Sequence, residues 1–120
     1  MNTLHIYRDE GHGITRTSLA FWDQNKHQVG RIMRVVVADV IERVTSPAGY
    51  ASEYSMIIYG STGMIILSGC NCGYGGEGPN GTAKILVELG MSVDEARRMM
   101  YEKRIDYRLG CLPKPVGVPC

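Results

Sequence analysis

The sequence predicts an α+β fold, with an N-terminal antiparallel β-sheet followed by two C-terminal helices. Runs of β-branched and aromatic residues fill the chain before residue 69, whereas helical spacing of apolar residues appears only afterwards. A glycine-rich stretch, Gly69–Leu89, joins the two parts. At 120 residues the chain has the length of one domain. We therefore expect a single α+β domain over residues 1–112 and an extended or disordered tail over the proline-rich residues 113–120.

The first strand is expected at Thr3–Tyr7, where strand-forming residues alternate. The polar segment Arg8–Gly13 should form a turn or a mobile loop, and Ile14–Thr17 a second short strand. We expect Phe21–Gly30 to be a loop or a single helical turn, because many polar groups surround its Phe and its Trp.

The segment Arg31–Arg43 carries charges that suit an amphipathic helix, but its valines and isoleucine favour a strand through its middle. A turn follows at Thr45–Gly49. Tyr54–Gly60 and Gly63–Ser68 are apolar on both faces and flank a short glycine-bounded loop, a pattern typical of a β-hairpin. This hairpin should lie centrally in the sheet or be covered by the helices.

Two helices are expected in the last third of the chain. Thr82 should cap the N-terminus of the first helix, which ends at Gly90. Ser92 and Glu95 have the spacing of a capping box, so a second helix is expected over about Val93–Tyr107.

The composition argues against several classes of function. A net charge of +1 does not support general attraction to DNA or to a membrane surface, and no apolar run is long enough to cross a bilayer. No secretory signal opens the chain, so we expect a cytoplasmic protein. Cys70 and Cys72 have C-x-C spacing and are expected to be small buried thiols rather than metal ligands or disulfides. We expect no metal and no cofactor.

The first candidate site is the junction between the glycine-rich stretch and its helix. Gly75, Gly76 and Gly81 would let a ligand approach the backbone, and Thr82 begins a helix whose free N–H groups suit an anion. On the second helix, helical spacing aligns a stripe that suits phosphates and a stacked base: Arg97, Tyr101, Arg104 and Arg108. The same residues also suit a loop shaped for packing and a solvated helix face, so both interpretations stay open here.

The run Cys72–Pro79 (CGYGGEGP), followed by Ala83 and Ile85–Leu86, resembles a signature of small bacterial and phage proteins, among them the phage anti-Thoeris sponge proteins of the first type described. Tyr101–Lys103 and Leu112–Pro113 resemble the closing helix and Leu-Pro of that family. The resemblance implies a small α+β domain that assembles into dimers or hexamers. It also implies binding of cyclic ADP-ribose isomers, and in some members of cyclic di- or trinucleotides, which are sequestered without cleavage.

The resemblance implies roles for individual residues. The residue after the signature proline is a polar ligand contact, here Asn80, and the phosphate-clamping arginine of the second helix corresponds to Arg97. Cys70 occupies the position of the family's stacking aromatic. The stacking role then falls to one of three other aromatics: Phe21, Trp22 or Tyr74. A second arginine comes from the N-terminal part, and we assign it to Arg16, with two alternatives: Arg8 and Arg31.

These observations predict a phage-type anti-defence protein that binds and sequesters a cyclic nucleotide immune signal in the host bacterial cytoplasm. It is expected to act as a homodimer or homohexamer and without catalysis, because no catalytic set has a recognisable local motif. Two other hypotheses stay open. One is an interaction module that inhibits a host protein through a methionine-rich apolar surface. The other is a small hydrolase that acts on the same ligands through Glu77 or a histidine.

Overall fold

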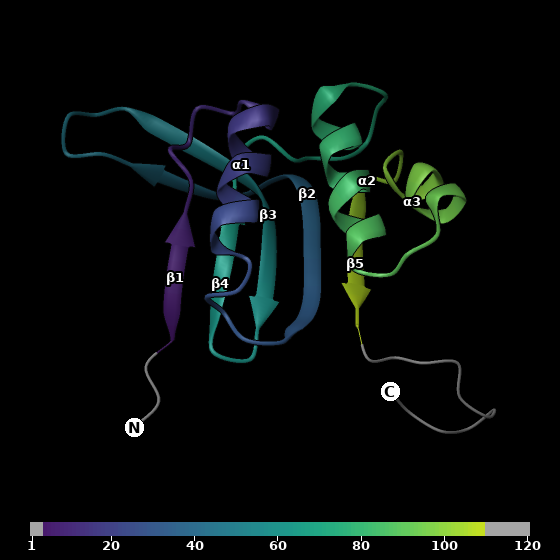
Figure 1. Ribbon diagram of the computed structural model, residues 1–120. Coiled ribbons are helices and arrows are strands. Elements are labelled where there is room, and N and C mark those ends of the chain that lie inside the picture. The colour runs from purple at the N-terminus through teal and green to yellow at the C-terminus, as the bar shows by residue number, and fades with distance from the viewer. Residues whose placement is uncertain (1–3, 110–120) are drawn as a thin grey trace.

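The computed structural model describes residues 4–109, and the expected tail over residues 113–120 lies outside this range. Five strands and three helices make up the described chain (Figure 1). In chain order they are β1 (His5–Arg8), α1 (Thr15–Asn25), β2 (Ile32–Thr45), β3 (Ala51–Gly60), β4 (Gly63–Leu67), α2 (Glu77–Glu88), α3 (Val93–Met99) and β5 (Arg104–Arg108).

The strands form one mostly antiparallel sheet in the order β1-β4-β3-β2-β5. Among the strands of residues 4–109, only β1 and β4 pair in parallel. The expected α+β class, with a sheet in the N-terminal part and helices α2 and α3 near the C-terminus, is confirmed. The expected hairpin is also confirmed, because β3 and β4 are central and pair through Met56–Leu67 to Tyr59–Met64.

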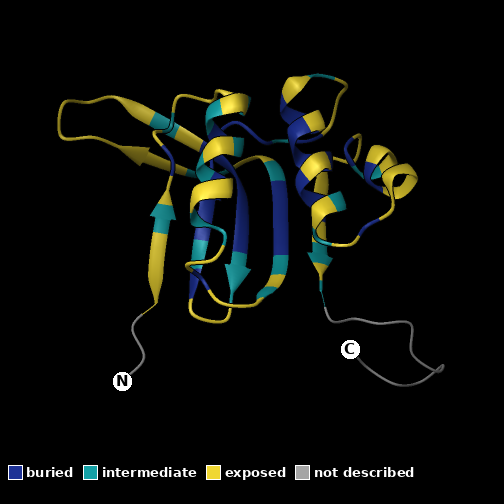
Figure 2. Ribbon diagram, in the orientation of Figure 1, coloured by how far each residue is buried: buried dark blue, intermediate teal, exposed yellow. Residues whose placement is uncertain are grey.

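The core lies between the sheet and the helices. Alternate residues of the central strands point toward the helices, so Val35 and Val37 lie beside their antiparallel partners Ile58 and Met56. These residues pack with Trp22 of α1 and with residues of α2 and α3. Figure 2 shows that burial is concentrated in the central strands, whereas the outer helix faces and the far end of the β2–β3 hairpin are exposed.

Helix α1 corrects two expectations, the short strand at Ile14–Thr17 and the loop or single helical turn at Phe21–Gly30, because residues 21–25 are the end of an 11-residue helix. The helix buries Ser18 and Trp22, which are four residues apart and therefore share one face. Ser18 is buried because its hydroxyl donates to Asp9 and accepts from the Gly69 backbone N–H. A polar residue thus occupies a core position, and the apolar stripe that normally reveals a helix is missing from the sequence.

The C-terminal elements also differ from expectation. Helix α2 begins at Glu77 rather than after Thr82, and the Thr82 side chain is buried within it and donates to the Asn71 carbonyl oxygen. Helix α3 ends at Met99, and the residues expected to continue it form the edge strand β5, which pairs with β2. Ile105 and Tyr107 face the core, so alternation with period two governs this segment.

The far half of the β2–β3 hairpin, residues 39–53, leaves the sheet as an arm (Figure 1). The register of β2 against β3 shifts between Val37 and Glu42, and such a shift bends the strand. Arg8 of β1 holds the base of the arm through a bidentate ion pair to Glu42, with distances of 2.7 and 3.0 Å. Ile41 packs on a small cluster on the sheet face away from the helices.

Candidate functional site: a groove between the last two helices

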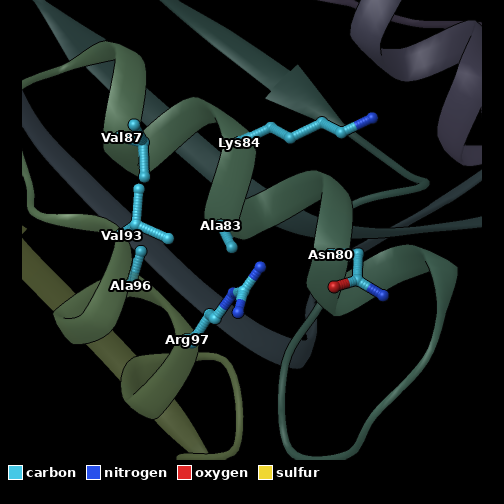
Figure 3. Close-up of a pocket in the computed structure, with 7 residues that line it drawn as sticks. All are labelled: Asn80, Ala83, Lys84, Val87, Val93, Ala96 and Arg97. Atoms are coloured by element: carbon cyan, nitrogen blue, oxygen red, sulfur yellow. The ribbon is translucent and has the colours of Figure 1, made fainter.

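A groove with a volume of about 540 Å³ runs between α2 and α3 (Figure 3). It is lined by four residues of α2 and three of α3: Asn80, Ala83, Lys84, Val87, Val93, Ala96 and Arg97. The α2 residues follow a helical i, i+3, i+4, i+7 stripe, which places them on one face. The groove therefore brings together Asn80 and Arg97, two residues singled out in the sequence.

The connection between the helices fixes the walls of the groove. Gly90 ends α2 with φ +112°, a left-handed conformation that favours glycine, and its N–H donates to the Val87 carbonyl oxygen. The Ser92 hydroxyl then accepts from the Glu95 N–H and caps α3. This short turn folds α3 back beside α2.

The polar groups gather at one end of the groove. Figure 3 shows the Arg97 guanidinium directed from α3 toward α2, with the Asn80 amide at the same end. The Lys84 side chain lines the groove, but its ammonium group is directed away from α3 toward α1. Among residues 4–109, neither Arg97 nor Lys84 forms a salt bridge. The Arg97 guanidinium is thus available to an anion at the Asn80 end of the groove, and Ala83, Val87, Val93 and Ala96 supply apolar walls.

The glycine loop does not form an open cradle. A Cβ atom at Gly75 would lie 2.9 Å from the Tyr101 hydroxyl, and one at Gly76 would lie 2.7 Å from the Tyr74 ring. Gly81 lies inside α2, where a Cβ atom would meet Thr15 at 2.5 Å. The space beside each of these glycines is occupied by another side chain of the protein. The interpretation that the loop is shaped for packing therefore explains why glycine stands at these positions.

Three other predicted site residues lie outside the groove. Arg16 is exposed on the first turn of α1. Arg104 and Arg108 are exposed on β5, and because Ile105 and Tyr107 face the core, the two arginines point to the opposite face of the sheet. The expected stripe of four side chains on one long helix is therefore wrong: β5 removes both arginines from α3.

The structure also places the candidate cysteine and the candidate stacking aromatics outside the lining of the groove. Cys70 is fully buried, and burial raises the pKa of its thiol to about 12. Trp22 is 2% exposed and donates to Glu88, and Phe21 packs against the core. Tyr74 is 48% exposed, but it lines a different hollow.

That second hollow lies where β1 and β4 end. Two adjoining polar cavities, with volumes of about 370 and 250 Å³, share Gly13, Ser68 and Asn71. Buried Asp9 lies beneath them and accepts hydrogen bonds from Ser18, from both the N–H and the hydroxyl of Ser68, and from the Gly11 N–H. Glu77 lines this hollow rather than the groove, so its carboxylate does not oppose an anion beside Arg97.

Lys84 and Val87 were missed in the sequence, although their spacing from Asn80 by four and seven residues is a helical signal.

Over residues 4–109, no three His, Cys, Asp or Glu side chains are grouped so as to hold a metal ion. In the same described range, no helix has the length and apolar character needed to cross a membrane. Comparison with protein-family models, curated proteins and solved structures finds no match to this chain.

Proposed function

We propose that this protein binds a cyclic nucleotide immune signal in the α2–α3 groove and sequesters it without cleavage. The observation that carries the proposal is the convergence of Asn80 and Arg97 on one cavity of about 540 Å³. A guanidinium recognises phosphate oxygens through paired hydrogen bonds, and the neighbouring amide can both donate to and accept from a base or ribose. The apolar walls suit the rest of an organic ligand.

The resemblance of Cys72–Pro79 to the sponge signature supplies the biological setting. On that basis the ligand is a cyclic ADP-ribose isomer or a cyclic oligonucleotide, and the protein acts as an anti-defence factor in the host cytoplasm. Sequestration needs binding alone, which fits a groove whose polar groups are an arginine, an amide and a lysine. Arg97 and Lys84 are cationic and the Asn80 amide is neutral, and none of the three forms a nucleophile with an adjacent base.

Calorimetric titration with cyclic ADP-ribose isomers, cyclic dinucleotides and cyclic trinucleotides tests the proposal. Replacing Arg97 or Asn80 by alanine should weaken binding, and the loss of a charge-assisted contact at Arg97 should cost about 1.5–3 kcal/mol, or roughly 10-fold to 150-fold in affinity. Arg98→Ala is a matched control, because Arg98 is the next residue, is exposed and lies outside the groove lining.

Two outcomes would contradict the proposal. The first is that none of these ligands binds the parent protein. The second is that Arg97→Ala and Arg98→Ala weaken binding equally, which would reflect general charge rather than the groove. Ligand recovered after denaturing the complex should be chemically intact, and a cleaved product would favour the hydrolase hypothesis instead.

The arm of residues 39–53 favours a second candidate function, a protein-interaction module. Val40, Val44 and Tyr50 are exposed there, with Tyr50 at 76%. A two-stranded hairpin gains little stability in water by itself, so an apolar arm suits contact with another protein or with a second copy of this chain. Native mass spectrometry of the parent and of a Val40→Ser, Val44→Ser, Tyr50→Ser variant would detect such an assembly.

A further inference from the structure

Tyr101 is an exposed aromatic residue that is not among the residues lining the groove. It is 61% exposed and follows Met100, the residue at the C-terminal end of α3. Met100 keeps helical backbone angles, and the Tyr101 N–H donates to the Arg98 carbonyl oxygen at 3.2 Å. The chain therefore continues for about one more turn, and Tyr101, four residues after Arg97, leaves it on the same side as Arg97.

The position of the ring is fixed by the glycine loop. The Gly73 N–H donates to the Met100 carbonyl oxygen at 2.8 Å, which ties the turn after α3 to the loop before α2. A Cβ atom at Gly75 would lie 2.9 Å from the Tyr101 hydroxyl and 3.4–3.5 Å from two ring carbons. One edge of the ring thus rests on glycine backbone while more than half of the side chain remains open to solvent.

The same loop places the ring beside the polar end of the groove. The Asn80 N–H donates to the Gly76 carbonyl oxygen in the first turn of α2, and Gly76 follows the glycine that holds Tyr101. Four residues separate Arg97 of α3 from Tyr101 in the turn that follows it, which corresponds to an axial distance of about 6 Å at helical rise. A ribose bridges a phosphate and a base over a comparable distance, so the base of a ligand whose phosphate bound at Arg97 would come within reach of Tyr101.

We propose that Tyr101 is the base-stacking residue of the groove, and that the groove therefore selects phosphate esters carrying a planar base over simple phosphates. This inference rests on the proposed function, because it takes the ligand phosphate to bind at Arg97. A tyrosine held by backbone loses little freedom on binding, and its ring accepts any base on its face.

The test compares a base-bearing ligand with one that lacks a base. Parent protein and the Tyr101→Leu and Tyr101→Phe variants are titrated with the cyclic nucleotide that binds best and with inorganic pyrophosphate. Tyr101→Leu should weaken the nucleotide about 5-fold to 150-fold, the range of one stacked base, and leave pyrophosphate unchanged. Tyr101→Phe should keep parent affinity for both, since it keeps the ring.

An independent readout comes from Tyr101→Trp. The chain has one tryptophan, Trp22, which is buried, so the added indole supplies a separate exposed fluorophore. Its emission should be quenched as the nucleotide binds and remain constant with pyrophosphate. A thermal unfolding curve for each variant identifies any loss of the Gly75 contact that disturbs the fold.

The outcomes separate this inference from the proposed function. If no nucleotide binds the parent, or Arg97→Ala binds as the parent does, the proposed function fails. If Arg97→Ala weakens binding while Tyr101→Leu does not, only the stacking role is overturned. If Tyr74→Ala weakens the nucleotide selectively while Tyr101→Leu does not, the base lies in the polar hollow, and the stacking role of Tyr101 is likewise overturned.

Discussion

Gly81 shows how closely single residues set the distance between α1 and α2. A Cβ atom there would lie 2.5 Å from Cγ2 of Thr15 and 3.3 Å from the Cys70 sulfur. Thr15 cannot simply turn away, because its hydroxyl donates to the Gly69 carbonyl oxygen at 2.7 Å. Gly81 therefore permits a close contact between α1 and α2.

We expect Gly81→Ala to lower the free energy of unfolding by about 1 kcal/mol net. Overpacking typically costs about 1–3 kcal/mol, and the better helix propensity of alanine returns about 1 kcal/mol. Urea denaturation measures the difference. Thr15→Ser removes the methyl group that is contacted while keeping the hydroxyl, so the double variant should recover part of the loss. Equal losses in both backgrounds would contradict the contact.

At the scale of elements, α3 is the short helix on which the groove depends. It has seven residues, too few to persist in water without packing and a good cap. The Ser92 hydroxyl accepts from the Glu95 N–H at 3.2 Å. Because α3 also carries Arg97, loss of the cap affects both folding and the proposed site.

Ser92→Ala should reduce the free energy of unfolding by about 1 kcal/mol, and Ser92→Asp should retain it, since aspartate also caps helices. Urea denaturation gives the stability, and calorimetry with the same variants gives ligand affinity. We expect Ser92→Ala to weaken binding and Ser92→Asp to preserve it. Unchanged stability in Ser92→Ala would mean that packing of Ala96 and Met100 holds α3 without the cap.

The elements predicted well from sequence are those whose burial follows a simple apolar pattern. Val35–Val37, Met56–Tyr59 and Met64–Leu67 are β-branched or apolar on both faces, and all lie in central strands. Helix α1 was missed because buried Ser18 interrupts its apolar face. Strand β5 was missed because its charged residues also fit helical spacing.

The residues of the candidate site also divide into those that local sequence identifies and those that only the fold reveals. Asn80 and Arg97 were found from a motif and a resemblance, each of which lies within one segment. Tyr101 was named together with Arg97 from helical spacing, whereas Lys84 required knowledge of how α2 sits against α3, and that placement follows from tertiary packing of Leu86 and Ala96 in the core. Local sequence carries little information on such contacts.

At the scale of the whole molecule, two ion pairs join strands that are far apart in sequence. Arg8 of β1 binds Glu42 of β2, and Arg34 of β2 binds Asp106 of β5 with distances of 2.7 and 2.8 Å. Hydrogen bonding to the guanidinium groups lowers the pKa of Glu42 below its ordinary 4.5 and that of Asp106 below its ordinary 3.8. The first pair secures the arm and the second secures the edge strand after α3.

These shifts predict that the molecule loses stability in acid. Since both carboxyls have a lower pKa when folded, the unfolded chain takes up protons first as the pH falls. The contribution of the pairs is complete above the ordinary pKa values of 4.5 and 3.8 and disappears as the pH falls through the lower folded values. The urea midpoint should therefore decrease between about pH 6 and about pH 3.

A variant with Glu42→Gln and Asp106→Asn should be less stable than the parent near neutral pH and should lose less on acidification, because neither replacement titrates. Asp94→Asn serves as the control, since Asp94 forms no salt bridge within residues 4–109, and it should retain the parent's full acid dependence. If the double variant and the parent lose equal stability in acid, then other carboxyls govern acid unfolding. In that case the strands would be held together by the apolar core and the backbone ladder rather than by these two pairs.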